Sequence, residues 1–379
     1  DMTWPMKKVS DLCAFAIDCV NKTAPVVDYE TKFKMIRTTN IKDGFVHLDS
    51  VKYVTEETFL KWTRRSKPQY GDVILTREAP VGQVGRFTSQ DQNVFLGQRL
   101  FHYRPLTEVL DWNFLAYALM SPDVQGRLQG MGFGATVDHI RVGDAENLEI
   151  PCPSVQIQRR IGDILSAYDD LIENNRRRIQ VLEESARQLY KEWFVRLRFP
   201  GHEHVKVVDG VPEGWEKKTL GEVAPFRYGK ALTAENRLGG DVPVYASSGH
   251  VGMHNKALAK APGIVIGRKG NVGSVYWVNK DYYPIDTTYY INTEKANLFL
   301  YYAIGNMNFI STDVAVPGLN RDYAHSKNIL VPDKIIISNF LEIVTILHSQ
   351  IDSLNVQNDK LAQARDLLLP KLISGEVAV

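Results

Sequence analysis

Two long stretches of the chain place apolar side chains at steps that alternate between four and three residues. The first stretch contributes Ile161, Leu165, Tyr168, Ile172, Asn175, Ile179, Leu182, Ala186, Leu189 and Trp193. The second contributes Phe340, Val344, Leu347, Ile351, Leu354, Asn358, Leu361, Arg365, Leu368 and Leu372. A mean step of about 3.5 residues keeps one seam of an α-helix turned toward a partner helix. We therefore predict two long helices that pair with each other, because either helix alone would expose its apolar stripe to water.

One asparagine interrupts each seam: Asn175 is fifth in its series of ten and Asn358 is sixth. Parallel helices would strand both amides against apolar side chains, at about 1–3 kcal/mol for each unpaired group. Antiparallel helices bring the two amides together, which costs stability but fixes register and orientation. The sequence thus predicts an antiparallel coiled coil with Arg365 beside Tyr168; the alternative is that both amides bind water at a partly wet seam. Arg176 to Arg178 lie off the seam, on what is most simply a solvated face.

The segment before the first helix is repeated, in related sequence, before the second helix. Residues 71–85, Gly-Asp-Val-Ile-Leu-Thr-Arg and then Val-Gly-Gln-Val-Gly, are echoed by residues 263–275. Residues 147–153, directly before the first helix, are echoed by residues 328–332 before the second. Each copy reads as a short apolar strand that enters a glycine-rich turn. Several echoes in the same order indicate a duplicated chain.

The expected fold class is α+β: two similar mixed, strand-rich globular domains, each followed by a long α-helix, with pseudo-twofold symmetry. Proline and glycine between the copies are expected to end the first helix. The predicted boundaries are 1–152 for the first domain, 153–198 for the first helix, 199–216 for a linker, 217–332 for the second domain, and 333–379 for the second helix and C-terminal tail.

Composition narrows the class of protein. The chain holds 45 Lys and Arg residues against 44 Asp and Glu residues, which argues against a uniformly basic nucleic-acid binder. The three cysteines, Cys13, Cys19 and Cys152, cannot pair evenly and lack zinc-site spacing, so we expect no metal and a reducing, cytoplasmic compartment. No apolar run approaches the roughly 18 to 20 residues of a membrane helix, so no membrane partner is expected.

Catalytic motifs are missing from the sequence. Residues 267–273, Gly-Arg-Lys-Gly-Asn-Val-Gly, lack the Gly-Lys-Ser/Thr ending of a phosphate-binding loop. The chain contains neither the Asn/Asp-Pro-Pro-aromatic tetrapeptide of amino-methyltransferases nor a His-Glu-x-x-His motif. We therefore predict a binding or scaffold protein and assign no catalytic residue.

Basic and polar loops favour a polyanionic partner. Cations alternate with aromatic residues in Lys61 to Lys67 and in Phe226 to Lys230, and residues 268–271 lie in a glycine-rich turn. Such loops can combine phosphate contacts with donors for base edges. The candidates are Lys61, Arg64, Arg65, Lys67, Arg227, Tyr228, Lys230, Arg268, Lys269 and Asn271. For each of them a solvated surface loop is the alternative interpretation.

Essentially the whole chain resembles the specificity (S) subunit of Type I DNA restriction–modification systems. The resemblance is carried by Leu-Tyr-Lys-Glu-Trp-Phe-Val-Arg-Leu-Arg-Phe-Pro-Gly at 189–201, Pro-Glu-Gly-Trp at 212–215, Val-Tyr-Ala-Ser-Ser-Gly at 244–249, Gly-Ile-Val-Ile-Gly-Arg-Lys-Gly at 263–270, Ile-Asp-Thr-Thr-Tyr-Tyr at 285–290 and Leu-Pro-Lys-Leu-Ile-Ser-Gly-Glu at 369–376. The segments at 244–290 are similar to a recurrent target recognition domain.

This resemblance implies a function that periodicity does not. Each globular domain would be a target recognition domain reading one half of a split, asymmetric DNA sequence, and the helices would set the spacer. Two modification subunits that carry S-adenosylmethionine and methylate adenine N6 would dock against this chain. Restriction subunits that use ATP and Mg can join such complexes. The chain itself would be non-catalytic and would bind no cofactor.

The comparison of the two domains adds further candidates for DNA contact. Residues 77–83 of the first domain take the place of residues 268–273, and residues 132–139 take the place of residues 316–321. These loops supply Arg77, Gln83, Thr136, His139, Asn320 and Arg321.

Two points stay open at the level of sequence. The near-neutral charge predicts weak DNA binding by the chain alone, with modification subunits supplying much of the nonspecific contact. The alternative function is a coiled-coil scaffold whose duplicated domains bind protein or carbohydrate.

Overall fold

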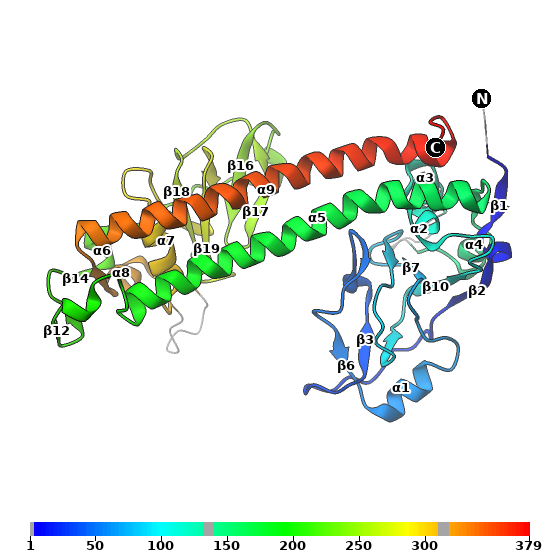
Figure 1. Cartoon of the computed structure of the whole chain (residues 1–379), viewed down its shortest axis with the longest axis horizontal. Coiled ribbons are helices and arrows are strands. Elements are labelled where there is room, and N and C mark those ends of the chain that lie inside the picture. Colours follow the sequence, from blue (N-terminus) through cyan, green and yellow to red (C-terminus); the bar gives the residue numbers. More distant parts are fainter. Residues whose placement is uncertain (1–3, 132–138, 310–317) are drawn as a thin grey trace. The chain divides into compact units, whose positions relative to one another are not determined.

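The computed structural model describes most of the chain (Figure 1), namely residues 4–131, 139–309 and 318–379. They form two compact units: unit 1 comprises residues 1–175 and 356–379, and unit 2 comprises residues 176–355. The predicted domains follow the order of the sequence, whereas each compact unit holds part of both long helices. This division arises because each globular part buries its own portions of the two helices in its core.

Unit 1 is built on a six-stranded sheet in the order β2-β10-β7-β8-β5-β4. Its strands are β2 (Cys13–Asp18), β4 (Ile41–Lys42), β5 (Gly44–Val46), β7 (Val73–Thr76), β8 (Val84–Arg86) and β10 (Leu100–Pro105). A three-stranded sheet in the order β6-β3-β9 consists of β3 (Lys34–Ile36), β6 (Lys52–Tyr53) and β9 (Val94–Leu96). A separate ribbon pairs β1 (Met6–Lys8) with β11 (Glu149–Pro151), directly before the first long helix.

The helices of unit 1 are α1 (Glu56–Trp62), α2 (Trp112–Met120), α3 (Pro122–Gly130), α4 (Val142–Glu146), the first part of α5 (Val155–Tyr190) and the last part of α9 (Lys334–Ser374). Short 3-10 turns occupy η1 (Val9–Leu12) and η2 (Thr38–Asn40). Helix α2 begins where the Asp111 side chain accepts a hydrogen bond from the backbone N–H of Phe114, which satisfies a donor that the helix leaves unpaired. It packs against β8 and forms the centre of the unit 1 core.

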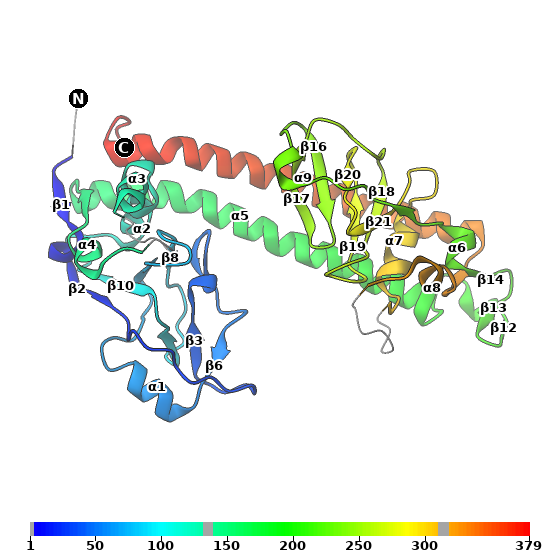
Figure 2. The ribbon, with the colours of Figure 1, turned by 180° about the vertical axis from the view of Figure 1, so that it is seen from behind.

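Unit 2 repeats this plan (Figure 2). Its main sheet has the order β15-β21-β18-β19, with β15 (Arg227–Tyr228), β18 (Gly263–Gly267), β19 (Val275–Val278) and β21 (Thr288–Ile291). Its second sheet, β17-β16-β20, consists of β16 (Val242–Ala246), β17 (Gly249–His254) and β20 (Tyr283–Pro284). Two ribbons pair β12 (Val207–Val208) with β13 (Val211–Pro212), and β14 (Glu216–Thr219) with β22 (Asn328–Val331).

The helices of unit 2 are α6 (Leu220–Val223), α7 (Leu298–Gly305), α8 (Arg321–His325), the last part of α5 and the first part of α9. Helix α5 ends at Tyr190 and passes into a π-helical turn, η3 (Lys191–Val195), so it stops short of the predicted end at residue 198. Two 3-10 turns, η4 (His202–His204) and η5 (Ala234–Asn236), follow.

The strand orders confirm the duplication. Strands β2-β10-β7-β8 of unit 1 correspond to β15-β21-β18-β19 of unit 2, and β6-β3-β9 corresponds to β17-β16-β20 with one antiparallel and one parallel pairing in each. Backbone hydrogen bonds fix the register of the match: the Thr76 N–H donates to the Gln83 carbonyl, and the Gly267 N–H donates to the Ser274 carbonyl, both at 2.8 Å. Thr76 therefore corresponds to Gly267.

Within unit 1 the two long helices meet through polar side chains as well as apolar ones. The Asn175 amide donates to Oδ1 of Asn358 at 3.0 Å, the contact that an antiparallel register predicts. The Arg365 guanidinium, expected beside Tyr168, donates to Oδ1 of the neighbouring Asp169 at 2.6 Å. Residue numbers that rise on α5 therefore pair with numbers that fall on α9.

Within unit 2 the same two helices meet through aromatic rings. Phe340 of α9 is fully buried, and its ring centroid lies 6.2 Å from that of Tyr190 on α5 and 4.9 Å from that of Phe194. Here too the end of α5 lies against the beginning of α9, which gives an antiparallel arrangement within the unit.

Helix α9 has a window of mean hydropathy 1.2, long and apolar enough by length and composition for a membrane span, contrary to the expectation from the sequence. Part of this apolar surface is seam: Phe340, Val344 and Ile351 are buried in unit 2. Ile335 and Ile346 are instead exposed. Helix α9 thus combines a packed face with an uncovered aliphatic face.

We expect Asn358→Leu to lower the unfolding free energy of unit 1 by about 1–3 kcal/mol, because it leaves the buried Asn175 amide without a partner. The double variant Asn175→Leu/Asn358→Leu should instead match or exceed wild-type stability, since two apolar side chains then pack across the seam. Urea denaturation of the three proteins checks this. Loss of stability in the double variant as large as in the single one would contradict the register role of the pair.

Candidate nucleic-acid interface

Four loops converge in each unit, and we call each group a loop cluster. The loop cluster of unit 1 is formed by residues 37–40, 77–83, 98–99 and 139–141. The loop cluster of unit 2 is formed by residues 246–249, 268–274, 286–287 and 318–321. Loops held on a sheet scaffold are the usual place for binding residues.

Backbone hydrogen bonds hold the unit 1 loop cluster together. The N–H of Arg77 donates to the carbonyl of Arg99 at 2.8 Å, and the N–H of Ile140 donates to the carbonyl of Arg77 at 3.0 Å. The Thr38 hydroxyl donates to the carbonyl of Ala79 at 3.1 Å. Loops far apart in the sequence are therefore joined at one place.

The unit 2 loop cluster is joined by the corresponding contacts. The N–H of Arg268 donates to the carbonyl of Thr287 at 2.8 Å, and the N–H of Leu319 donates to the carbonyl of Arg268 at 2.8 Å. The hydroxyl of Ser247 accepts from the N–H of Asn271 at 3.4 Å. Arg268 thus stands where Arg77 stands in unit 1, and the duplicated fold builds the same frame twice.

Tyr228, at the end of β15, lies beside the unit 2 loop cluster. Its ring is 48% exposed and packs edge-on against Tyr289, with ring centroids 5.1 Å apart. The guanidinium of Arg321 lies 4.9 Å from the centroid of the Tyr228 ring, and that of Arg268 lies 5.5 Å from it. An exposed aromatic ring beside two cations combines cation–π stabilisation with donors for phosphate or base edges. The sequence named all three of Tyr228, Arg268 and Arg321, and the structure brings them together.

The corresponding position in unit 1 is different. Tyr228 pairs with Tyr289 across the strands of unit 2, and Asp18 pairs with Phe101 across the equivalent strands of unit 1. The Asp18 carboxylate accepts a hydrogen bond from Arg65, one of the predicted residues. One half of the chain therefore offers an aromatic ring where the other offers an ion pair.

The predicted residues of the first domain differ in exposure and in the contacts that they make. Arg77 is only 9% exposed, and its Nε donates to the carbonyl of Ile140 at 2.9 Å, so it holds the loop cluster together instead of presenting a free guanidinium. The structure thus gives Arg77 a structural role, and its contact with DNA stays a prediction. Gln83 is exposed and His139 half-buried in the loop cluster, while Thr136 lies outside the described residues.

The basic segment Lys61 to Lys67 lies at the end of α1. The Lys61 ammonium pairs with the Glu57 carboxylate at 3.2 Å, and the Arg64 Nε donates to the carbonyl of Lys61. The Lys67 ammonium lies 5.7 Å from the centroid of the Phe59 ring. These three predicted cations make their described contacts around α1, and Arg65 alone of the set reaches the end of β2.

A buried network fixes the turn after α1. Nε2 of His102 lies 2.6 Å from the Asp72 carboxylate and Nδ1 lies 2.9 Å from the Ser66 hydroxyl, while Arg104 donates to Asp72 and to the carbonyl of Lys67. Burial lowers the pKa of His102, although its bond with Asp72 opposes this shift. Burial by itself would raise the pKa of Asp72, but the hydrogen bonds from Arg104 and His102 lower it below its usual value. A neutral histidine and a carboxylate thus anchor the basic segment.

The remaining predicted residues of the second domain lie on or next to the unit 2 loop cluster. Lys269 and Asn271 are exposed, and the Asn320 side chain caps α8 by accepting from the N–H of Tyr323 at 3.0 Å. Arg227 and Lys230 are exposed at β15 and just after it.

Sequence reasoning missed the cations of the unit 1 loop cluster. A cavity of about 270 Å³ there is lined by Arg37, Thr38, Gln98 and Arg99, among others. Arg37 donates to the carbonyl of Ser50 at 3.1 Å, and Arg99 pairs with a carboxylate of the same loop cluster at 3.2 Å. The signal was the repeat itself, because Arg-Thr-Thr-Asn at 37–40 takes the place of Ala-Ser-Ser-Gly at 246–249.

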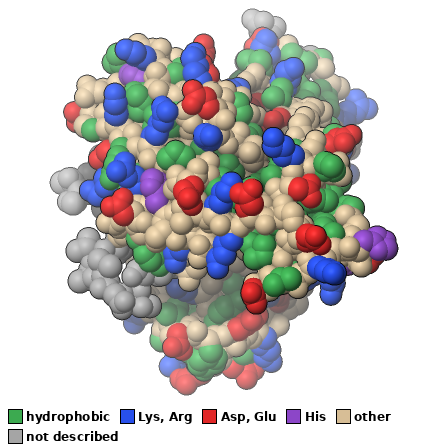
Figure 3. All heavy atoms as spheres, turned by 90° about the vertical axis from the view of Figure 1, so that its left-hand side faces the viewer, with side chains coloured by type: hydrophobic (Ala, Val, Ile, Leu, Met, Phe, Trp, Pro, Cys, Tyr) green, Lys and Arg blue, Asp and Glu red, His purple; other side chains and the backbone are tan. Residues whose placement is uncertain are grey.

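Charge over the rest of the surface is mixed. On the face seen in Figure 3, Lys and Arg side chains alternate with Asp and Glu side chains, which agrees with their nearly equal totals in the chain. In residues 4–131, 139–309 and 318–379, no group of His, Cys, Asp or Glu side chains could hold a metal ion. Cys13, Cys19 and Cys152 are free and buried.

Comparison with known proteins gives one consistent result. The family model described as Type I restriction modification DNA specificity domain matches residues 2–184 and 212–363. The Type I restriction enzyme MjaIX specificity subunit of Methanocaldococcus jannaschii is 25% identical over 358 residues, covering 86% of this chain and 82% of that protein. The putative type I specificity subunit S.MgeORF438P of Mycoplasma genitalium is 32% identical over 184 residues, covering 48% of this chain and 46% of that protein.

A solved structure shares the fold. The crystal structure of a Type I restriction–modification S subunit from M. genitalium aligns with a TM-score of 0.58 at 22% identity, covering 98% of this chain and 96% of that chain.

Proposed function

The chain belongs to the Type I restriction–modification DNA specificity family, and from this premise we propose that it directs a modification complex to a bipartite, asymmetric DNA sequence. Each loop cluster would read one half of the target. Arg, Asn and Gln side chains are suited to base edges in the major groove, and Lys and Arg to phosphates. The alternative of a scaffold with protein- or carbohydrate-binding domains is not favoured by the family match.

One observation carries the proposal of an asymmetric target: the two loop clusters, with the strand ends beside them, share a backbone frame but differ in side chains. Tyr228 in unit 2 stands where Asp18 stands in unit 1, and Ala246 stands where Arg37 stands. Equal frames with different donors and acceptors would select different bases, so the two half-sites would differ in sequence.

The helices support the second part of the proposal, that they set the spacer and dock two modification subunits. Helices α5 and α9 each run without interruption from one unit into the other. Exposed aliphatic side chains offer docking surface: Ile164, Leu171 and Leu367 in unit 1, and Ile335, Ile343 and Ile346 in unit 2. Contiguous exposed apolar patches are characteristic of protein interfaces, and Ile343 and Ile346 lie one turn apart on α9. One modification subunit would bind each unit.

We assign the chemistry to the partners. The chain would be the non-catalytic member of the complex, S-adenosylmethionine would be bound by the modification subunits, and ATP and Mg by restriction subunits where these are present. The complex would act in the cytoplasm, where the host DNA lies.

The test is to express the chain with its modification subunit and to sequence the methylated bases of the host genome. We expect adenine methylation at a split motif with two different halves and a fixed spacer. The isolated chain should bind the same duplex weakly, since its formal net charge is only +1. Methylation without a bipartite motif, or none at all, would contradict the proposal; tight, specific binding by the isolated chain would contradict the division of labour between the subunits.

A further inference from the structure

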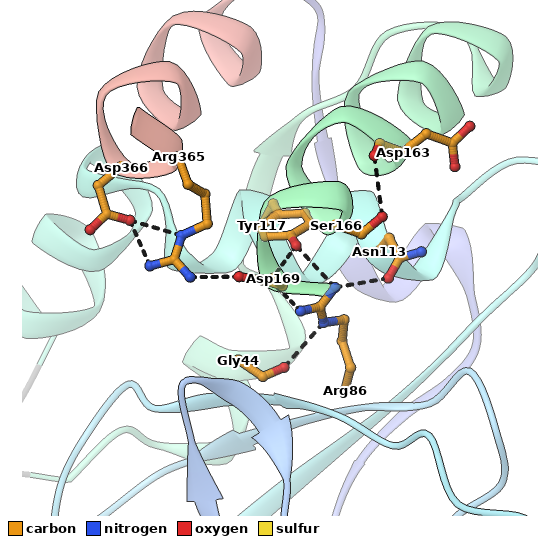
Figure 4. A network of polar contacts seen from close by, with 9 residues as sticks. All are labelled: Gly44, Arg86, Asn113, Tyr117, Asp163, Ser166, Asp169, Arg365 and Asp366. Carbon is orange, nitrogen blue, oxygen red and sulfur yellow. Dashed lines mark hydrogen bonds and ion pairs between the residues drawn. The ribbon is translucent and has the colours of Figure 1, made fainter. Parts of the chain in front are cut away.

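Asp169 of helix α5 accepts hydrogen bonds from three different elements of unit 1 (Figure 4). Arg86 of β8 and the hydroxyl of Tyr117 on α2 both donate to Oδ2, and Arg365 of α9 donates to Oδ1 at 2.6 Å. Asp169 is 4% exposed. A single buried carboxylate therefore joins the sheet, the domain helix and both long helices.

Arg86 is equally constrained. Its guanidinium is buried, and besides Asp169 it donates to the carbonyl of Gly44 at 3.1 Å, to Oδ1 of Asn113 at 3.1 Å and to the hydroxyl of Tyr117 at 3.0 Å. Such a network is satisfied in one arrangement, because sliding the sheet along the helix would break several charged hydrogen bonds at once. Apolar contacts of similar volume would tolerate small shifts and are often no less stable, so a buried ion pair fixes geometry more than it adds stability.

In unit 2 the equivalent contact between the sheet and the long helices contains, among the described residues, no buried ion pair. Arg86 and Trp277 are the third residues of the equivalent strands β8 and β19. Asp169 and His348 lie the same number of residues after Pro153 and Pro332, which precede the two helices.

This contact in unit 2 is formed by aromatic side chains and borders a cavity. Nε2 of His348 lies 2.7 Å from the Tyr302 hydroxyl, and burial lowers the pKa of this histidine although Asp352 opposes the shift. Trp277 and Tyr301 pack around His348, with ring centroids 6.3 and 6.0 Å from its own. They line a cavity of about 580 Å³. One hydrogen bond among rings beside a cavity holds a domain less strictly than the network around Asp169.

We propose that Asp169 is a positioning residue that holds the first recognition domain in one orientation on the helices and thereby limits the spacer lengths that the complex accepts. The inference rests on the proposed function. One base pair adds about 3.4 Å along the duplex, so a domain that rocks by a few ångströms would admit a neighbouring spacer. In this role Asp169 does not contact DNA and acts only through the domain that it positions.

The functional test uses the complex of this chain with its modification subunit. Duplexes carry both half-sites with spacers that differ by one base pair, and methylation is measured by sequencing. For Asp169→Asn we expect the preference for the native spacer over its neighbours to fall about tenfold, or about 1.4 kcal/mol, with both half-site sequences unchanged. The matched control His348→Asn should keep the wild-type preference. A folded Asp169→Asn protein with wild-type spacer preference would overturn the proposal.

A second variant covers the case in which Asp169→Asn does not fold. Replacing the network by apolar groups, Arg86→Met/Tyr117→Phe/Asp169→Leu/Arg365→Leu, removes the buried charges together and so leaves none unpaired. It should fold and methylate neighbouring spacers more than the wild type does. A sharp wild-type spacer preference in this variant would likewise overturn the role of the network.

A measurement without DNA separates this inference from the proposed function. Spin labels at Gln92→Cys on the domain and Gln156→Cys on α5 report the distance between domain and helix within unit 1; both positions are exposed and the native cysteines are buried. We expect a narrow distance distribution for the wild type and a broader one for Asp169→Asn. Equal widths would overturn the positioning role, whereas broadening in a chain whose complex methylates no bipartite site would retain it and reject the proposed function.

Discussion

An Arg86→Ala variant is expected to lose about 3–5 kcal/mol of unfolding free energy in unit 1, because it removes one of the two ion pairs of the buried Asp169 and leaves several buried hydrogen-bond acceptors without their donor. Asp169 would keep Arg365, but Tyr117, Asn113 and the carbonyl of Gly44 would all lose a buried partner. A loss of this size is a large part of the stability of an ordinary domain. Guanidinium denaturation, with hydrogen exchange to locate the change, measures it.

The control for this variant is Arg127→Ala. Arg127 pairs with Asp123 one turn away on α3, at 3.0 Å on the surface, so its loss should change stability by less than about 1 kcal/mol. Faster hydrogen exchange should appear in unit 1 of the Arg86 variant, with unit 2 unchanged. If both variants unfold at the wild-type denaturant concentration, the buried network contributes little to folding.

Arg268→Ala should lower the affinity of the assembled complex for its target by about 10- to 100-fold, the effect of losing one good base or phosphate contact worth about 1–3 kcal/mol. Its guanidinium lies in the unit 2 loop cluster, by the exposed ring of Tyr228. Discrimination should relax at one half-site only. Binding at fixed salt to duplexes altered in each half-site in turn measures this.

Arg77→Ala is the matched control, because Arg77 occupies the equivalent position of unit 1 but is buried and donates to the carbonyl of Ile140. It should reduce the stability of unit 1 more than it changes base preference. Equal losses of affinity without any loss of stability in the two variants would show that burial does not separate their roles.

The pairing of the long helices could be predicted because it depends on periodicity within each helix. Ten seam positions with one asparagine each left a single register that pairs the amides, and Asn175 does bond to Asn358. The partner of Arg365 could not be predicted in the same way. Its long side chain reaches past the seam position Tyr168 to the carboxylate of Asp169, and a heptad pattern says nothing about that reach.

The candidate site was predicted as residues but not as an arrangement. Tyr228, Arg268 and Arg321 come from three separate segments: β15 and β18 come together because both pair with β21, and the segment that begins α8 is held to Arg268 by the N–H of Leu319. Arg77 is buried where its Nε donates to the carbonyl of Ile140, and the sequence does not show that these two distant residues meet. Arg86 was not predicted either, because it is one charged residue in an apolar strand. In the repeat it occupies the position equivalent to Trp277.

The two compact units differ in whether their residues are continuous in sequence, and this difference affects the order in which the units can fold. Unit 2 is one continuous segment, residues 176–355, whereas unit 1 needs residues 356–379 as well. The core of unit 1 contains Leu369, Leu372 and Ile373 from the end of α9. Because ribosomes add residues from the N-terminus at about 5–20 per second, unit 2 has all its residues before unit 1 does. The N-terminal domain, made first, must therefore wait for the last helical turns before its core can close.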